Sequence, residues 1–451
     1  MNSLQTLNLL RAYESRNVTF IEPGGSWPIV WERARGAHVW DAAGKKYLDL
    51  TAAFGVAAAG HANARVVRAG QKQMGRLLHA MGDVHPHALK AAVARELSAV
   101  TFERWRERAG KPARSGNQSE RGKTIFCNSG FEAVEAALKT AMLATGKAGL
   151  IAFRGAYHGL GYGALTATHR AHFRSPFRSQ LREFAVFVDF PGSSGPGTTA
   201  GFLPGGMDKI ESEIGELLQS GEFGAVLVEP IQVRGGINIP PVFFLPRLRS
   251  LCNEYGTLLI VDEIYTGFGR TGKWFACEHS ETTPDLICLG KALTGGFPLS
   301  ACVGRADLMD KAWPPSTGEA IHTSTYLGHP VGCAMALAQI NDIRRLRLPE
   351  RSAKSGAGLL AALTAIRPAK SGIRLAARGC GLLAGLDLRE RDGSPATSKA
   401  FEVIKKMLRR GFILLPEGEH GNVISFSPPL TIAQPQLRAA LNALAEVLEQ
   451  E

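Results

Sequence analysis

The sequence predicts an α/β protein, with a large domain in which a mostly parallel seven-stranded sheet lies between helices, and a smaller α+β domain. Three observations lead to this prediction: short, continuously apolar runs in the middle of the chain, helical stretches between them, and alternating patterns nearer both ends. The composition, 45% hydrophobic and 20% charged, excludes a disordered, collagen-like or coiled-coil chain. We expect residues 61–335 to form the large domain, and residues 1–60 and 336–451 to form the small one.

The predicted sheet comes from seven runs that end at small or acidic residues. They are TIFC (124–127), GLIAF (149–153), FAVFV (184–188), AVLVE (225–229), LLIVDE (258–263), LICLG (286–290) and SACVG (300–304). Hydrophobicity that is continuous rather than alternating is typical of strands covered by helices on both faces. The stretches 132–145, 207–219 and 245–255 are long enough to make the helical crossovers that parallel strands require.

The terminal segments carry a different pattern. HVWDAAGKKYLDL (38–50) has two alternating runs around an Ala-Gly turn, which predicts a hairpin. Residues 382–388 and 423–426 are predicted strands, and a helix is expected from about Gln434 to the end. Strands flanked by helices in this part of the chain predict the smaller α+β domain.

The charge balance is basic, because 52 Lys and Arg against 40 Asp and Glu give a formal net charge of +12. Such a charge attracts anionic ligands but does not determine a fold. The densest basic stretch, 101–123, lacks the aromatic pattern of a nucleic-acid site, so we expect a solvated, mobile loop and no nucleic-acid partner. Residues 191–206 are rich in Gly, Pro and Ser, which predicts another loop.

The cysteines and histidines give little sign of disulfides or metal. Seven cysteines are scattered without a Cys-x-x-Cys pair, which is typical of reduced core residues. No run reaches the ~18 apolar residues of a membrane span, and the N-terminus lacks the apolar core of a signal peptide, so we expect a cytoplasmic protein with no membrane partner. His85 and His87 form a His-x-His pair without an evident third ligand, so no metal site is predicted.

Three features at predicted strand ends carry chemistry. Ser129 and Gly130 lie between a strand and a helix, where free N–H groups and the helix dipole suit a phosphate, although such a pair is often only a helix cap. Asp262 ends a buried strand and needs a cation or strong donor, which a protonated pyridine nitrogen or an arginine would supply. Lys291 follows the run LICLG, where desolvation frees an amine for imine formation, unless the side chain reaches out to solvent.

Together the three features match the phosphate, ring nitrogen and aldehyde of pyridoxal phosphate. From about residue 36 to residue 448 the chain resembles the class III (ω-amino acid) aminotransferases, which are fold type I pyridoxal-phosphate enzymes. The resemblance is carried by NSGFEAVEAALKTA (128–141), AYHG (156–159), VEPIQ (228–232), VDEIYTGFGRTG (261–272), LGKALTGGFPLSA (289–301), HTSTYLGHP (322–330) and VISFSPPLTI (423–432). It implies that fold, pyridoxal phosphate as the cofactor, and residues 61–335 as the cofactor-binding domain.

The resemblance also implies two catalytic residues. Lys291 would form a Schiff base with the cofactor aldehyde and, once released, would move the proton between the substrate carbon and the cofactor. Asp262 would keep the ring nitrogen protonated, so that the ring withdraws electrons from the substrate carbon.

The same resemblance implies further cofactor contacts. In addition to Lys291 and Asp262, they come from Ser129, Gly130, Phe131, Tyr157, Gln232 and Thr325. The first three would hold the phosphate, Tyr157 would stack on the ring, and Gln232 would bind the ring hydroxyl. Phe131 stands where the family often has a small or hydroxylated residue. Thr325 matches a residue that reaches the phosphate of the neighbouring subunit, which implies a homodimer with the active site at the subunit interface; a loop hydroxyl that caps its own backbone is the alternative.

The chain departs from the family on the substrate side. Many members carry a Glu two positions after the Gln of VEPIQ and an Arg before Pro-Pro-Leu, and this pair lets one site accept both an ω-amine and a 2-oxo acid. Arg234 and Ser425 occupy these positions, so both halves of that switch are missing. Either Arg234 binds the substrate carboxylate from the opposite wall, with Ser425 leaving room, or it points to solvent. Phe54 is a further candidate for the substrate pocket, unless it only packs in the core.

The resulting prediction is an aminotransferase that moves an amino group from a primary amine or amino acid, preferably a terminal amine, to a 2-oxo acid by a ping-pong route. Its partners would be these two small molecules. A pyridoxal-phosphate-dependent aminomutase or racemase of the same fold is the alternative, because the missing switch removes one argument against such an isomerase. Turnover of a single substrate without an acceptor would distinguish the isomerase.

Overall fold

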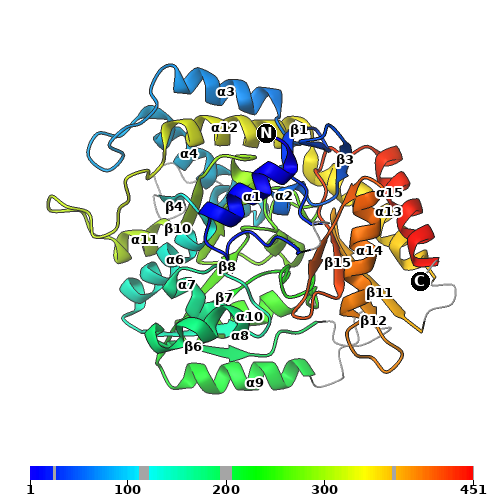
Figure 1. The fold of residues 1–451 in the computed structure, drawn as a ribbon. Coiled ribbons are helices and arrows are strands. Elements are labelled where there is room, and N and C mark those ends of the chain that lie inside the picture. The colour runs from blue at the N-terminus through cyan, green and yellow to red at the C-terminus, as the bar shows by residue number, and fades with distance from the viewer. Residues whose placement is uncertain (24–26, 111–120, 193–205, 368–371, 450–451) are drawn as a thin grey trace.

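A seven-stranded sheet forms the centre of the molecule (Figure 1). The computed structural model describes residues 1–23, 27–110, 121–192, 206–367 and 372–449, so 111–120 and 193–205 of the two predicted loops lie outside the described residues. The strands of the sheet are β4 (Gly122–Cys127), β5 (Gly149–Phe153), β6 (Ala185–Val188), β7 (Phe223–Val228), β8 (Leu258–Asp262), β9 (Leu286–Leu289) and β10 (Ser300–Arg305). Their order is β4-β10-β9-β8-β7-β5-β6, and each predicted apolar run falls on one of them.

The sheet is mostly parallel, as predicted. Strands β6, β5, β7, β8 and β9 pair in parallel, whereas β10 is antiparallel to both β9 and β4. Ile151 and Val226 belong to one hydrophobic cluster, while their neighbours Leu150 and Ala225 belong to another. Because successive side chains of a strand point to opposite faces, the two clusters cover the two faces of the sheet. Burial on both faces explains the continuous apolar runs, and the predicted fold class is confirmed.

Helices surround this sheet. The three predicted crossover helices are present as α6 (Gly130–Thr145), α9 (Gly206–Gln219) and α10 (Phe244–Glu254). The other described helices are α1 (Ser3–Tyr13), α2 (Ala52–Gly55), α3 (Ala64–Met74), α4 (Ala88–Ser98), η1 (Ala99–Glu103), α5 (Arg104–Arg108), α7 (Tyr162–Ala167), α8 (Ala171–Arg174), η3 (Ser175–Gln180), η4 (Ala276–Ser280), η5 (Lys291–Leu293), α11 (Ala306–Ala312), α12 (Pro330–Arg345), α13 (Leu348–Ala365), α14 (Thr397–Arg409) and α15 (Gln434–Glu449). Among the described residues, no helix is long and apolar enough to cross a membrane.

Two smaller sheets are built from the ends of the chain. One contains β1 (Trp31–Arg35), β2 (His38–Asp41), β3 (Lys46–Asp49) and β13 (Phe412–Ile413). The other contains β11 (Arg374–Cys380), β12 (Leu383–Arg389), β15 (Val423–Phe426) and β14 (Leu415–Glu417), which pair antiparallel. The predicted hairpin is β2–β3, and the parallel pair β3–β13 joins the two ends of the chain. In Figure 1, α13, α14 and α15 line the right-hand side, and α1 crosses the front.

The basic stretch 101–123 is not one loop, so that prediction was wrong at its start. The stretch begins inside a π-helix, η1 (Ala99–Glu103), which continues into α5 (Arg104–Arg108). Trp105 explains the difference, because its side chain is buried and its Nε1–H donates to Glu278 at 3.0 Å. Both terminal arginines of α5 pair with the same carboxylate. These basic residues therefore neutralise a buried acid, which a solvated loop would leave unpaired.

Candidate active site

The carboxyl ends of the parallel strands open onto a cavity of about 420 Å³. Of the residues predicted for the site, it brings together Gly130, Phe131, Tyr157, Arg234, Asp262 and Lys291. They lie at or just after the ends of β4, β5, β7, β8 and β9. Because these strands are neighbours or near neighbours in the sheet, segments far apart in the sequence meet at this edge.

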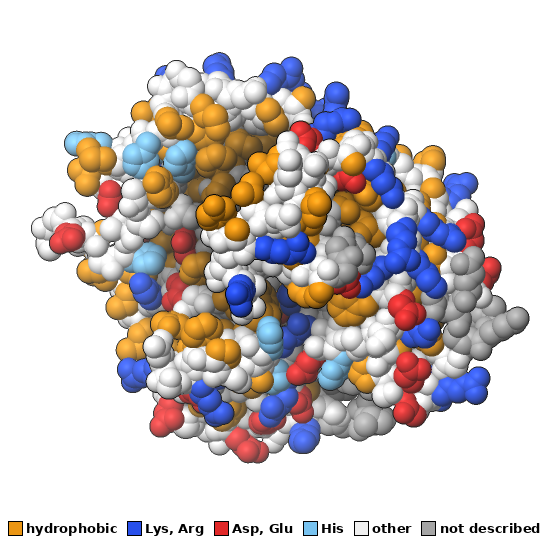
Figure 2. Space-filling model, in the orientation of Figure 1, with side chains coloured by type: hydrophobic (Ala, Val, Ile, Leu, Met, Phe, Trp, Pro, Cys, Tyr) orange, Lys and Arg blue, Asp and Glu red, His pale blue; other side chains and the backbone are white. Residues whose placement is uncertain are grey.

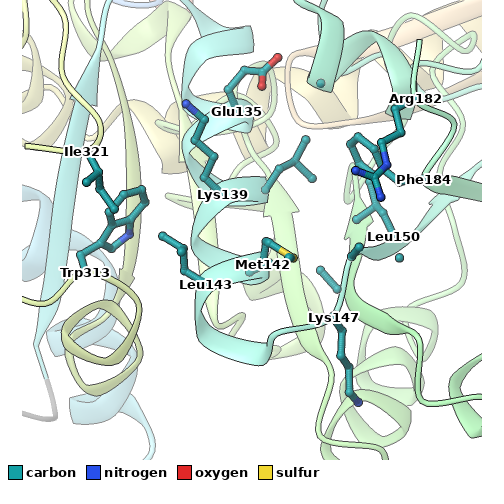
Figure 3. Close-up of a pocket in the computed structure, with 17 residues that line it drawn as sticks. Glu135, Lys139, Met142, Leu143, Lys147, Leu150, Arg182, Phe184, Trp313 and Ile321 are labelled. Atoms are coloured by element: carbon teal, nitrogen blue, oxygen red, sulfur yellow. The ribbon is translucent and has the colours of Figure 1, made fainter.

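A second hollow, of about 490 Å³, lies along α6 (Figure 3). Figure 3 shows Trp313 and Ile321 on one side of α6 and Arg182 and Phe184 on the other. Of the described residues that line this hollow, none belongs to the site predicted from the sequence. We therefore take the cavity at the strand ends as the candidate active site.

Lys291 lies close to the sheet, because β9 ends at Leu289 and Lys291, two residues later, begins η5. Its φ of +36° is uncommon for a residue with a β-carbon, so the surrounding structure must hold it there. Nζ lies 4.7 Å from the centre of the Tyr265 ring. Burial lowers the pKa of Lys291, while the carboxylates of Asp262 and Glu229 oppose this shift. More of the amine is therefore neutral and nucleophilic than for a lysine in water.

Asp262 ends β8 with its carboxylate buried. Oδ1 accepts the backbone N–H of Ile264 at 3.0 Å, and Oδ2 lies 2.8 Å from Nδ1 of His158. Because an ionised carboxylate only accepts, we assign the proton to Nδ1 of His158. In the described chain, Nε2 of His158 has no hydrogen-bond partner. His158 thus orients Asp262, a role that sequence reasoning missed although the residue lies in the motif AYHG.

The start of α6 has the features of the predicted phosphate-binding position. Ser129 precedes the helix, and its buried Oγ has no hydrogen-bond partner within the described part of the chain. The first amide groups of a helix also lack intrahelical partners, so an anion here would receive both O–H and N–H donors. Phe131 packs against Gly159 and Gly161, where a β-carbon would come within 2.3 Å and 2.5 Å of its atoms. The two glycines therefore make room for the bulky side chain that departs from the family pattern.

Tyr157 lines the cavity, whereas Gln232 does not. The backbone N–H of Tyr157 donates to Glu229 at 3.0 Å, which fixes the segment that carries the ring. Gln232 is 1% exposed, with Nε2 donating to the carbonyl of Arg154 at 2.8 Å and Oε1 accepting from Asn238 at 3.1 Å. The fold therefore engages both polar atoms of Gln232, and its contact with a cofactor stays a prediction.

Besides Ser129 and Gln232, three further predicted residues are not among the described residues that line this cavity. Thr325 is exposed in the segment that precedes α12. Phe54 is 46% exposed and borders a separate, mainly apolar hollow. Ser425 is 3% exposed within β15. A single chain therefore does not bring these three side chains together with the lysine and the acid.

Arg234 has a partner that sequence reasoning did not find. Its Nη1 lies 3.4 Å from Oε2 of Glu417, the last residue of β14. Burial raises the pKa of Glu417 to about 7, and the cations Arg234, Arg170 and Lys291 oppose that rise. No motif surrounds Glu417, so only its position in the fold connects it with the cavity.

The chain matches the class III aminotransferase family over residues 21–448. It belongs to this family. An acetylornithine aminotransferase of Methanosarcina mazei is 34% identical over 426 residues, which cover 94% of this chain and 92% of the relative. A 5-aminovalerate aminotransferase of Pseudomonas aeruginosa is 34% identical over 443 residues and 94% of both chains. An amine transaminase from an uncultivated Pseudomonas species, solved with pyridoxal phosphate bound, is 27% identical with a TM-score of 0.83, covering 97% of this chain and 98% of that one.

Class III aminotransferases use pyridoxal phosphate, and the cavity of this aminotransferase fits that cofactor. The unpartnered hydroxyl of Ser129 beside a helix start suits the phosphate. The buried carboxylate of Asp262 suits a protonated ring nitrogen, and the desolvated amine of Lys291 suits the aldehyde. When bound, the cofactor supplies an aldehyde that condenses with amines and a ring that withdraws electrons.

Proposed function

We propose that this aminotransferase transfers the amino group of a primary amine, preferably a terminal one, to a 2-oxo acid in two half-reactions at one cavity. The observation that carries the proposal is that Lys291 and Asp262, from neighbouring strands, line the same cavity as the start of α6. The 5-aminovalerate for which one relative is named has its amino group at the end of the chain, which supports a terminal amine as the donor.

The two catalytic residues have complementary tasks in this proposal. Lys291 would hold the cofactor aldehyde through Nζ and, once the donor's amine has released it, its free amine would carry the proton taken from the substrate carbon. Its lowered pKa favours an amine that accepts a proton. Asp262, oriented by His158, holds the proton at the ring nitrogen.

The remaining cofactor contacts belong to the same proposal. Ser129, Gly130 and Phe131 hold the phosphate at the start of α6. Tyr157 stacks on the ring, and Gln232 reaches the ring hydroxyl. The unpartnered hydroxyl of Ser129 supports the phosphate contact, and the position of Tyr157 on the cavity wall supports the stacking; the Gln232 contact rests on the family resemblance.

We further propose a homodimer with the active site at the subunit interface. Residues 75–87 and 321–328 lie side by side, since Oγ1 of Thr323 donates to Asp83 at 2.7 Å. Their surface, which we name the apolar rim, exposes Leu77, Leu78, Met81, Val84, Ile321 and Tyr326. Figure 2 shows orange side chains mixed with histidines at the upper left of this face, near the end of α3. Such a surface is typical of an interface, and Thr325 within it would reach the phosphate bound by the other copy.

The domain division and the compartment complete the proposal. Residues 61–335 form the cofactor-binding domain, and residues 1–60 and 336–451 form the small domain. The pairing of β3 with β13 supports the second assignment, because it joins the two ends of the chain. The seven free cysteines support a reducing, cytoplasmic location.

The test combines product analysis with a lysine variant. We expect the purified holoenzyme to convert 2-oxoglutarate or pyruvate into its amino acid only when a terminal amine is supplied. Borohydride should fix the cofactor on the peptide that contains Lys291. Lys291→Ala should lower the rate by about 10³-fold or more, because a positioned proton carrier contributes up to about 10⁴-fold.

Lys311→Ala is the matched control, because Lys311 is an exposed lysine of α11 and should be silent. Rearrangement of the amine without an oxo acid would instead assign an isomerase. Fixation of the cofactor on another lysine would overturn the role of Lys291.

A further inference from the structure

The proposed function places two differently charged substrates in one cavity. A 2-oxo acid brings a carboxylate, whereas a terminal amine donor can present an uncharged group at the same place. A permanently unpaired cation would favour the first substrate and penalise the second, because bringing an apolar group against a cation strips away its water. The cavity therefore needs a cation whose charge can be neutralised when no carboxylate is bound.

Arg234 is a cation placed for this purpose. It lines the cavity together with Lys291, and its side chain is 30% exposed. Its backbone is fixed, because its carbonyl accepts Nη2 of Arg170 at 2.6 Å and the N–H of Gly418 at 3.3 Å. Its guanidinium, in contrast, has a loose contact with Glu417 at 3.4 Å and lies 5.5 Å from the centre of the Tyr157 ring. The backbone of Arg234 is therefore held by two hydrogen bonds, whereas its guanidinium is held by a longer ionic contact.

Glu417 differs from the other buried glutamates of the site. Glu229 accepts the N–H groups of Tyr157 and Val233, at 3.0 Å and 3.2 Å. Glu417 is 2% exposed, and its donor in the described chain is the loosely placed guanidinium of Arg234, 3.4 Å from Oε2. A buried carboxylate without close donors is costly unless a cation lies beside it or a proton neutralises it. Burial accordingly raises the pKa of Glu417 to about 7.

We propose that Arg234 and Glu417 form an exchangeable ion pair, in which the guanidinium leaves Glu417 to bind the carboxylate of a 2-oxo acid and returns when the bound substrate has no charge there. Where many relatives pair a Glu with an Arg, this chain has Arg234 and Ser425, and Glu417 restores a pair with its charges exchanged. The inference rests on the proposed function, since it concerns how that same cavity selects substrates.

The experiment measures binding to the holoenzyme with two unreactive probes of equal length, valerate and valeramide, by titration calorimetry. Their difference isolates the charge of the carboxylate. We expect Arg234→Gln to weaken valerate binding by roughly 10- to 100-fold, the value of one or two charged hydrogen bonds, and to leave valeramide within about twofold. Arg234→Lys keeps the positive charge but loses the paired N–H donors of the guanidinium. Its affinity for valerate should therefore lie between those of Arg234→Gln and the wild type.

Glu417 is tested in the opposite direction. Glu417→Gln should tighten valerate binding by about threefold or more, because the guanidinium no longer has to leave an anion. In the Arg234→Gln background the same change should have no effect on valerate, since the two residues act as one pair. Glu419→Gln is the matched control, because it removes the same charge from an exposed residue two positions after Glu417.

Equal losses for both probes in Arg234→Gln would overturn the inference, because they would mean a structural role. So would weaker valerate binding in Glu417→Gln, or additive effects in the double variant. Because the probes cannot react, these results do not depend on turnover. Absence of amino transfer in the wild type would refute the proposed function by itself, whereas normal transfer with unaltered valerate binding in Arg234→Gln would refute only the exchangeable pair.

Discussion

Buried carboxyl groups in this aminotransferase differ in what donates to them. Asp262 has the ring N–H of His158 and a backbone N–H, which leave its charge stabilised at the end of β8. Glu263, the next residue, accepts the hydroxyl of Thr266 at 2.5 Å and the N–H of Cys277 at 2.8 Å, and is not itself among the described residues that line the cavity. Asp262 therefore lines the cavity at the end of β8, whereas Glu263, the first residue after the strand, is fully buried.

Glu263 gives a prediction about pH. Burial raises its pKa from 4.5 to about 7, so its protonated form favours the folded state. This contribution is complete below about pH 4.5 and is lost as the pH rises through about 7. Between about pH 5 and pH 8 the unfolding free energy of the wild type should fall as Glu263 ionises. We expect this fall to be smaller by roughly 1–3 kcal/mol in Glu263→Gln. Urea denaturation of the apoprotein measures it.

The control for this prediction is Glu254→Gln, which removes a carboxylate from an exposed position of α10. It should keep the wild-type dependence on pH. The interpretation fails if Glu263→Gln keeps that dependence too.

At the level of elements, close packing of two backbone segments limits which substitutions helix α13 tolerates. Helix α13 packs on the turn between β11 and β12 at Gly356. A β-carbon there would lie 1.9 Å from the carbonyl oxygen of Gly381, which itself has a φ of +58°. Gly358, in the same helix, has no atom within 4 Å of its β-carbon position among the described residues.

These two glycines form a matched pair of predictions. Gly356→Ala should lower the unfolding free energy by about 1–3 kcal/mol or more, because backbone atoms cannot move aside without separating the helix from the hairpin. Gly358→Ala should raise it by about 0.5–1 kcal/mol, since alanine loses less entropy in a helix. Denaturant unfolding of both variants provides the comparison, and equal effects would show that α13 does not contact the turn.

For the whole molecule, the proposed homodimer places the apolar rim at the subunit interface. Met81 and Tyr326 are 55% and 54% exposed, and the ring of Tyr326 is in contact with that of His79 at 5.5 Å. Water around so many apolar groups favours association. Thr325 and Phe54 lie outside the cavity of their own chain, which is consistent with a site completed by a second copy.

Met81→Lys tests this association. We expect the wild type to sediment as a dimer and the variant to shift toward monomer, because a buried unpaired ammonium is costly. Monomeric protein should bind pyridoxal phosphate roughly tenfold more weakly, the loss of one charge-assisted hydrogen bond from Thr325. Val242→Lys, at a residue that is 65% exposed elsewhere on the surface, should stay dimeric. A wild type that sediments as a monomer would contradict the proposal.

The sequence alone identified the seven central strands, the crossover helices and the residues at the strand ends. These features follow from local patterns, because continuous apolar runs mark strands covered on both faces and a parallel sheet gathers the residues that follow them. Ser129, Asp262 and Lys291 could therefore be singled out before any fold was known. The basic stretch was misread because the burial of Trp105 depends on a distant glutamate.

Only the tertiary structure decided which side chains meet across elements. Glu417 reaches Arg234 because β14 of one sheet ends beside the segment that follows β7 of another, and no local pattern encodes that approach. The same reason applies to His158 and Asp262, and to Gln232, whose amide is engaged by a neighbouring segment. Side-chain contacts between sheets depend on strand order and packing distance, which are properties of the folded chain.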